Sequence, residues 1–470
     1  MNSVSPFLPN HILSLNYKIN NTENNNKHVK RRKFIKSTLL TVGLLITISV
    51  FGNSFSKFIP SDDVESVLTY IHSNWKRSIN KDQPGTGFLG IDLPYPYTSP
   101  CIKNEGHFSF FFYWDTYFTN LGLLRNGLHQ QAKNNIKNML WFIEEQGYMP
   151  NHVGLFNRSQ NPYLQMMIND YFKYVPDKSE AFYKECAEGL RKEYQFWMTA
   201  RYSASGLNRF GHHENAEECI KFYNTVGNQR LKLQLDIPEE EKAVIGGNLI
   251  AEAESMDFCQ RYNQRATEFN AVDLNALLWG YENFLYTASN KLNWYLKDFY
   301  KDRAQKRKDL MNKYLWNDTL GWFFDYDFVK KEQSKVFSVS GLQPLFMGIA
   351  SQAQAEKVLK NLHLLEREYG IATTNELSGC RDFQWAYPVV WPPMVYITVI
   401  GLDNYGFKED ARRIAKKFID VNTALFKEHH KLFEKTNAET GKLSTADYGT
   451  PPMMGWTAGI YIALVEYLKS

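Results

Sequence analysis

The chain has 470 residues, enough for about two or three ordinary domains or for one large helical barrel. Its charges nearly balance, with 54 Lys and Arg against 50 Asp and Glu, so the formal net charge at pH 7 is only +4. This small, evenly spread charge argues against a nucleic-acid partner. Aromatic residues make up 15% of the chain, which is typical of a large helical core or of a site that stacks flat apolar faces.

Residues 1–56 have the pattern of a leader. A polar, low-complexity stretch at 20–26 precedes "RRKFIK", and an apolar run follows at 39–51. Because this run is too short to span a bilayer core about 30 Å thick, it favours an export signal over a membrane anchor. Arg31 and Arg32 resemble a twin-arginine signal, so the twin-arginine export machinery is an expected partner. The predicted location is periplasmic or extracellular, with an uncleaved membrane anchor as the alternative.

Residues 57–470 have no linker or low-complexity segment, which predicts one continuous domain. Apolar residues recur with helical spacing from Asp273 onward, and Asp177 and Glu180 have the spacing of a capping box at the start of another helix. Strand-like alternation is scarce. Helices are predicted at residues 182–197, 273–285, 411–425 and 456–468. We expect about ten to twelve helices in an all-α toroid or solenoid, with functional residues on the loops at one end.

Metal and disulfide chemistry find no support in the sequence. The five cysteines are scattered, odd in number and without metal-ligand spacing. His212 and His213 are adjacent, so their side chains point apart, and we interpret them as polar surface. No glycine-rich phosphate loop or serine nucleophile elbow is present.

Seven segments instead place a carboxylate or an amide beside Trp, Tyr or Pro. They are "FYWDTYF", "PNHVGLFNRSQNP", "GHHEN", "ESMDFCQRY", "QWAYPVVWPPM", "LFEKTNAETG" and "ADYGTPPMMGWTAG". Sugar recognition uses this combination, because hydroxyls need polar partners while the CH face of the ring needs an aromatic platform. Hydrolysis of a glycosidic bond also needs two carboxyls, one of them kept protonated by apolar surroundings. Asp257, between Met256 and Phe258, suits the protonated role.

Each carboxylate also has an ordinary interpretation when it is taken alone. Asp257 and Arg261 have the i, i+4 spacing of a helical ion pair, and Asp257 could equally be a helix cap. Asp115 could cap a helix, and Glu434 lies in a charged segment that is typical of solvated surface. Composition and spacing therefore indicate no more than a helical carbohydrate-active protein.

Taken in order, the segments resemble the trehalase family of glycoside hydrolases over roughly residues 104–470. "GHFSFFFYWDTYF" and "RDFQWAYPVVWPPM" resemble the two family signatures, and further matches are "MPNHVGLFNRSQNP", "AESMDFCQRY", "AVDLNALLW" and "MMGWTAG". The resemblance implies an all-α (α/α)6 toroid barrel. It also implies hydrolysis of a disaccharide, α,α-trehalose, to two glucose molecules with inversion and without a cofactor or metal. We expect a monomer.

The resemblance also assigns the site residues. The general acid falls on Asp257 and the general base on Glu434. Arg158 and Glu214 are expected to hold hydroxyls and to influence the pKa of both carboxyls. The substrate-binding positions that it implies are His107, Trp114, Asp115, Asn151, Arg158, Ser159, Gln160, Glu214, Ser255, Gln384, Trp385, Asp447 and Trp456.

Several positions depart from the family pattern. His107 and His212 stand where trehalases carry arginine, and Ala386 replaces the aspartate of the second signature. Each arginine lost removes a fork-shaped donor that reads vicinal hydroxyls. The departures predict a working hydrolase with altered subsite preference. The leading hypothesis is a trehalase. The alternatives are an inverting hydrolase of another short α-linked glycoside and a catalytically silent sugar-binding protein.

Overall fold

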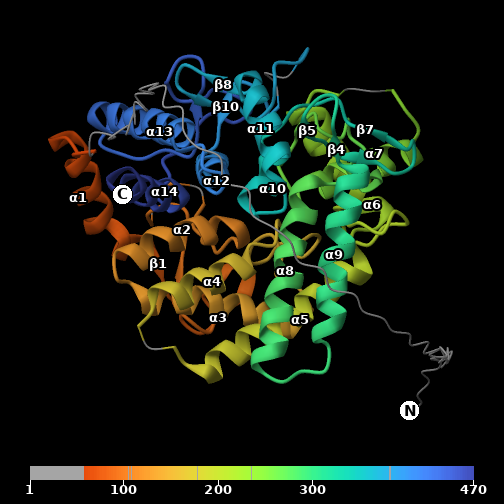
Figure 1. Ribbon diagram of the computed structural model, residues 1–470, viewed down its shortest axis with the longest axis horizontal. Helices are drawn as coiled ribbons and strands as arrows, with labels where there is room; N and C mark the ends of the chain where they lie inside the picture. The colour runs from red at the N-terminus through yellow and green to blue at the C-terminus, as the bar shows by residue number, and fades with distance from the viewer. Residues whose placement is uncertain (1–57, 104, 107, 177, 234–235, 380–382) are drawn as a thin grey trace, which may run out of the picture. The chain divides into compact units, whose positions relative to one another are not determined.

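The computed structural model describes residues 58–470, apart from residues 104, 107, 177, 234–235 and 380–382 (Figure 1). The predicted leader, His107 and Asp177 therefore lie outside the described residues. Within the described part of the chain, no helix is long and apolar enough to cross a membrane.

Helices dominate the described residues, and the strands are pairs of residues that join loops. The α-helices are α1 (Asp62–Ser78), α2 (Tyr113–Arg125), α3 (His129–Gln146), α4 (Leu164–Tyr174), α5 (Glu180–Ala200), α6 (Ala216–Phe222), α7 (Glu239–Glu252), α8 (Val272–Lys291), α9 (Lys297–Tyr314), α10 (Gln343–Phe346), α11 (Gln352–Asn361), α12 (Pro392–Asp403), α13 (Lys408–His429) and α14 (Gly455–Lys469). A π-helix, η2 (Tyr223–Arg230), joins α6 to α7. The 3-10 segments are η1 (Phe88–Gly90), η3 (Ala266–Glu268), η4 (Val339–Leu342) and η5 (Leu362–Leu364).

The strands pair antiparallel. Four two-stranded ladders join β1 (Ile79–Asn80) to β2 (Tyr97–Thr98), β4 (Trp316–Asn317) to β5 (Trp322–Phe323), β8 (Glu366–Arg367) to β9 (Gly370–Ile371), and β10 (Val389–Val390) to β11 (Thr436–Asn437). A three-stranded ladder has the order β3 (Phe269–Asn270), β6 (Tyr326–Asp327), β7 (Glu332–Gln333). The β10–β11 pair sets Val390 opposite Thr436, so it joins the loop before α12 to the loop before α14.

The helices form two concentric rings. The inner ring runs α2, α4, α8, α10, α12, α14, each packed against the next, and it closes because α14 packs against α2. Helices α1, α3, α5, α9, α11 and α13 alternate with them along the chain and cover the outside, as Figure 1 shows for α9 beside α8. The inner helix α2 is buried on all sides along almost its whole length, whereas the outer helix α13 buries one stripe. The predicted (α/α)6 barrel is confirmed.

Helical periodicity located the packed helices correctly. The apolar residues that predicted α8, Leu274 to Leu285, are buried, and the predictions for 411–425 and 456–468 correspond to α13 and α14. The predicted capping box of α5 is wrong. Ser179 is its N-cap, and its hydroxyl accepts the Phe182 N–H at 3.2 Å. A serine oxygen beside the first turn satisfies the same free N–H groups that an aspartate would.

Helices α6 and α7 and the π-helix η2 form an excursion between α5 and α8. They pack on one another rather than within the inner ring. The sequence predicted no such unit, and π-helices are rare segments that often mark functional sites. Its placement matters because Arg230, the last residue of η2, reaches the cavity described below.

The loops that enter the inner helices meet at one end of the barrel. Trp114 lies in the first turn of α2, Asn151 precedes α4, Asp257 precedes α8, Gln384 precedes α12 and Glu434 precedes α14. All five residues line one cavity. The alternation of inner and outer helices brings the chain back to this end before each inner helix, which is how segments far apart in sequence come together.

Candidate active site

A cavity of about 500 Å³ opens at this end of the barrel. That volume lies within the range of about 300–1,000 Å³ that is usual for small-molecule sites. Its wall consists of Phe108, Phe112, Trp114, Asp115, Asn151, Gln160, Arg230, Ser255, Asp257, Gln384, Trp385, Trp391, Glu434, Tyr448, Met453 and Trp456. Most of the predicted substrate-binding side chains and both predicted catalytic carboxyls are therefore brought together, and Arg230, Tyr448 and further apolar side chains join them.

Four tryptophans form the apolar part of the wall. Trp385 and Trp391 stack with ring centroids 3.9 Å apart and an angle of 6° between their planes. Trp114 lies 5.2 Å from Trp385, and Trp456 meets Trp391 edge-on at 5.7 Å. Rings locked together in this way present fixed flat surfaces, which suit the CH faces of pyranose rings.

Asp257 lies in the loop between α7 and α8, half-buried in the cavity wall. Burial raises the pKa of its carboxyl to about 6, while Arg158 and Arg230 lower it and Asp447 raises it. The alternative of an Asp257–Arg261 pair is wrong. The Arg261 guanidinium binds Asp273 at 2.9 Å and Asp325 at 2.8 Å inside the protein. The alternative of a helix cap is wrong as well, because Asp257 lies in the loop between the two helices, where Ala253 is the C-cap of α7 and Ala271 is the N-cap of α8.

Glu434 faces the same cavity from the loop before α14. Its side chain is buried, which corrects the alternative of a solvated surface residue. The Tyr448 hydroxyl donates to Oε1 at 2.7 Å, and Lys435 Nζ lies 3.1 Å from Oε2 without forming a hydrogen bond. Burial raises the pKa of Glu434. The contacts with Lys435 and Tyr448 lower this pKa, and the nearby charge of Asp257 raises it. Among the described residues, Oε2 accepts no hydrogen bond, so it can accept one from a water molecule.

Asp115 is the third carboxylate of the cavity. It lies in the first turn of α2, which follows Phe112 as N-cap, so Asp115 is not the cap. Burial raises its pKa well above the ordinary value, and the nearby charges of Glu434 and Asp257 raise it further. Gln160 is tied to the same turn, because its Oε1 accepts the backbone N–H of Trp114 at 3.0 Å.

Backbone contacts hold several predicted site residues in place. Asn151 Nδ2 and Arg158 Nε both donate to the Ala253 carbonyl, at 3.3 and 3.1 Å. Arg158 lies outside the cavity wall, although its charge acts on Asp257. Ser159 is fully buried, and its hydroxyl donates to the Met149 carbonyl at 2.6 Å. The structure therefore does not bring Ser159 to the cavity as a substrate-binding side chain.

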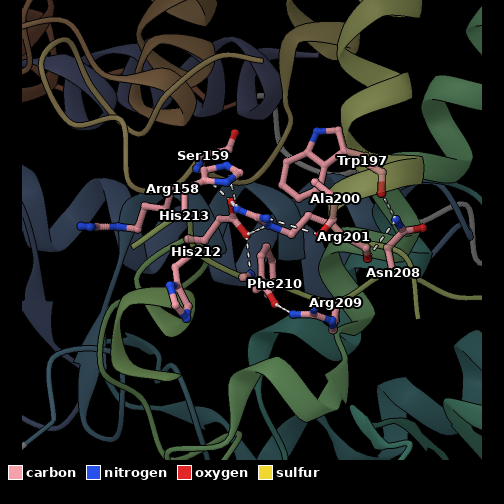
Figure 2. A network of polar contacts seen from close by, with 12 residues as sticks. Arg158, Ser159, Trp197, Ala200, Arg201, Asn208, Arg209, Phe210, His212 and His213 are labelled. Carbon is pink, nitrogen blue, oxygen red and sulfur yellow. Dashed lines mark hydrogen bonds and ion pairs between the residues drawn. The ribbon is translucent and has the colours of Figure 1, made fainter. Parts of the chain in front are cut away.

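A buried ion pair that lies outside the cavity wall connects these loops. Arg201 binds Glu254 through Nε at 2.8 Å and Nη2 at 2.9 Å. Figure 2 shows the network of polar contacts around Arg201. Glu254 also accepts the backbone N–H groups of Ser159 at 2.8 Å and Gly211 at 2.7 Å. Neither charged residue was among the predicted site residues, because nothing local in the sequence indicates that they meet inside the protein. The pair ties the loops before α4 and α8 to the segment that follows α5.

Two further predicted positions, Glu214 and Asp447, lie away from the cavity wall. Glu214 is half-buried outside it, and its backbone N–H donates to His212 Nδ1 at 3.2 Å. Asp447 turns its carboxylate to Arg230, which binds both oxygens. Ser255 does line the cavity, and its hydroxyl donates to Asp273 at 3.3 Å. The prediction for His107 lies outside the described residues.

Six residues of the wall were not among the predicted site residues: Phe108, Phe112, Arg230, Trp391, Tyr448 and Met453. Five of them lie inside motif segments that had been recognised, so the motifs themselves could have indicated them. Arg230 lies in no such segment, and its position depends on the π-helix.

Comparison with known proteins gives a consistent result. The Trehalase family model matches residues 49–469. The periplasmic trehalase of Xanthomonas axonopodis pv. citri is 30% identical over 83% of this chain and 71% of its own length. The periplasmic trehalase of Escherichia coli O1:K1 is 26% identical over 88% of this chain and 76% of its own. These relatives are named as periplasmic, which supports export of this chain to the periplasm.

Solved structures share the fold. The neutral trehalase of Saccharomyces cerevisiae superposes with a TM-score of 0.68 at 23% identity, covering 85% of this chain and 80% of its own. The mannosylglycerate hydrolase of Thermus thermophilus superposes with a TM-score of 0.56 at 15% identity, covering 85% of this chain and 100% of its own. The family match over almost the whole folded chain, together with the barrel and its carboxylate-lined cavity, shows that this protein is an enzyme of the trehalase family of glycoside hydrolases.

Proposed function

We propose that the protein hydrolyses α,α-trehalose to two glucose molecules with inversion, using Asp257 as general acid and Glu434 as general base. The observation that carries the proposal is the difference between the two carboxyls. Asp257 has a pKa raised to about 6, while Glu434 is paired with Lys435 and Tyr448 and keeps one oxygen without a donor. One acid and one base in a single cavity is the set of groups that inverting hydrolysis requires.

The acid step follows from the surroundings of Asp257. A carboxyl with a pKa near 6 holds a proton in part of the molecules at neutral pH, which an exposed aspartate would not. Asp257 donates that proton to the glycosidic oxygen as the bond from this oxygen to the anomeric carbon breaks. The leaving sugar departs as a neutral alcohol, and Asp257 is left as a carboxylate beside Arg158 and Arg230.

The base step follows from Glu434 Oε2, which accepts no hydrogen bond from the described residues although Lys435 Nζ lies 3.1 Å away. Oε2 takes one proton from a water molecule while the water oxygen forms the new bond to the anomeric carbon. Lys435 and the Tyr448 hydroxyl favour the ionised form of Glu434 before the reaction. Attack from the face opposite the leaving group gives one β-glucose, and the leaving sugar keeps its α configuration. Proton exchange with solvent restores both carboxyls.

The rest of the wall is suited to hold the first sugar, which is the one whose anomeric carbon the water attacks. Asp115 and Asn151 offer polar groups from the N-terminal side of α2 and α4, and Trp385 offers a flat face. We assign Gln160, Gln384, Trp114 and Trp456 to the same binding surface. Ser255 lies at its edge.

The proposed chain organisation completes this assignment. Residues 1–56 act as a leader that directs the protein to the twin-arginine export machinery, and residues 57–470 form the catalytic domain. The periplasmic names of the relatives support this location. A working monomer is part of the same proposal.

A proton-NMR time course of the anomeric signals with α,α-trehalose tests the proposal. We expect equal initial amounts of α- and β-glucose from the parent. Asp257→Asn and Glu434→Gln should each lose at least about a hundredfold in kcat. Lys357→Met, which breaks an exposed ion pair with Asp318 outside the cavity wall, is the matched surface control and should keep the parent rate.

Other α-linked disaccharides belong in the same experiment. The position of Glu214 outside the wall and the pairing of Asp447 with Arg230 favour an altered second subsite, and hence another short α-glycoside as second candidate. A clear preference for such a substrate would replace trehalose in the proposal. Sugar binding without turnover of any disaccharide would instead indicate a silent binding protein.

A further inference from the structure

We propose that Arg230 determines substrate specificity by binding neighbouring hydroxyls of the leaving sugar. This inference rests on the proposed function and adds a residue that the motifs do not contain. Three features of the guanidinium support it: its position, the groups that hold it and the donors that it keeps free.

Arg230 bridges three separate parts of the structure. It lies at the end of η2, and its Nε is 2.8 Å from both carboxylate oxygens of Asp447 in the loop before α14. Its Nη2 donates to Gln384 Oε1 at 2.6 Å in the loop before α12, and also contacts Asp447. The guanidinium therefore stands at the cavity wall with its orientation fixed by two loops that are distant from it in sequence.

Two aromatic rings restrict the guanidinium further. Its central carbon lies 4.7 Å from the centre of the Phe258 ring and 5.3 Å from that of Tyr448. Arginine held between rings and a carboxylate loses little additional freedom when it binds a ligand. Phe258 follows Asp257 directly, so the guanidinium is held next to the proposed acid.

The depth of Arg230 assigns it to the second sugar. Its side chain is 32% exposed, whereas Asp115 is only 6% exposed, so Arg230 lies nearer to the solvent than Asp115 does in the cavity wall. A disaccharide that enters this cavity places its first ring among Asp115 and the tryptophans and its second ring at the mouth. Asp257 protonates the oxygen between the rings. A donor beside Asp257 at the mouth therefore faces the leaving sugar.

The remaining donors indicate the chemistry of the ligand. A guanidinium carries five N–H groups, and the contacts to Asp447 and Gln384 use Nε and Nη2. Among the described residues, Nη1 makes no hydrogen bond and keeps both of its N–H groups. Since Asp447 balances the positive charge, the pair favours a neutral polyhydroxylated ring over an anionic aglycone. Asp447 then acts as a positioning residue for Arg230.

Two substrates with the same first sugar separate this role from structural support. α,α-Trehalose has a leaving sugar, whereas α-glucosyl fluoride has a leaving group without hydroxyls. We expect Arg230→Met to lower kcat/KM for trehalose by about 30-fold or more, the effect of losing hydrogen bonds from a charged donor. The loss on the fluoride should stay below about fivefold. Arg230→Lys, which keeps the charge without the fork, should fall between parent and Arg230→Met on trehalose.

Arg265→Met is the matched control. Arg265 is also partly exposed and binds Asp327 at 2.7 Å together with Glu268, but it lies outside the cavity wall. It should change the two substrates equally and by little. Equal losses on trehalose and fluoride in Arg230→Met, or no loss on either, would overturn the proposal.

Failure of the proposed function gives a different result. A parent that turns over neither substrate refutes the hydrolase assignment, whatever Arg230 does. Titration of tryptophan fluorescence with trehalose then decides the inference, because four tryptophans line the cavity. Binding at least about tenfold weaker in Arg230→Met supports it. Equal binding by parent and variant, or no binding by the parent, overturns it.

Discussion

Replacing Arg201 by methionine should both destabilise the protein and weaken catalysis. The Arg201 and Glu254 side chains are 3% and 0% exposed, and two hydrogen bonds of 2.8 and 2.9 Å join them. Without Arg201, the Glu254 carboxylate keeps, among the described residues, only the N–H groups of Ser159 and Gly211. Removing one partner of a buried ion pair costs about 3–5 kcal/mol, because the other charge stays away from water.

The melting temperature converts this loss into a measurement. An unfolding entropy of about 2.1 cal/mol/K per residue over roughly 410 residues is about 0.9 kcal/mol/K, so 3–5 kcal/mol lowers the Tm by about 3–6 °C. Scanning calorimetry of parent and Arg201→Met gives this difference. Because Glu254 holds the loops that carry Gln160 and Asp257, kcat/KM should fall as well, even where the variant is fully folded.

Two further variants make the result specific. Lys357→Met breaks an exposed pair with Asp318, with 41% and 77% of the two side chains accessible, and should cost less than about 1 kcal/mol. Arg201→Met combined with Glu254→Gln removes the stranded charge while keeping an acceptor, so it should be more stable than Arg201→Met alone. A Tm change in Arg201→Met no larger than that of Lys357→Met would refute the reasoning.

Three other predictions concern the chemistry of the cavity. Because Asp257 must be protonated to act as acid, kcat/KM should fall tenfold per pH unit as the pH rises beyond its pKa of about 6, and a pH–rate profile with a flat alkaline side would contradict this role. The Tyr448 hydroxyl donates to Glu434 Oε1 and so favours the ionised carboxylate, and Tyr448→Phe should therefore raise the pKa of Glu434. The acidic limb of the profile should then move to higher pH, and kcat/KM should fall about tenfold. An unchanged acidic limb in that variant would count against Glu434 as base. Because the proposed proton transfers use only these two carboxyls, dialysis against EDTA should leave kcat/KM for trehalose unchanged, and a loss restored by a divalent metal would contradict the proposed mechanism.

The sequence determined the class of fold and the place of the site. Helical periodicity identified α8, α13 and α14 because their buried residues are close neighbours in sequence. The motif segments fell on loops before the inner helices, and the turns of the barrel bring those loops to one end. The sequence therefore predicted Asp257 and Glu434 as cavity residues, although their individual surroundings suggested an ordinary ion pair and a solvated surface.

Only the tertiary structure decided what each charged side chain contacts. Arg261 binds Asp325, which lies 64 residues away, instead of the aspartate four residues before it, and Arg230 meets Asp447 across 217 residues. Ser159 was expected at the substrate and is buried under the loop, because its hydroxyl satisfies a backbone carbonyl. Charge spacing and helical periodicity can be recognised only between residues that are close in sequence, whereas ion-pair partners and cavity walls depend on the packing of segments that are distant in sequence. For that reason the sequence indicated the two carboxyls, and the fold alone assigned Arg230 and Glu254 their places.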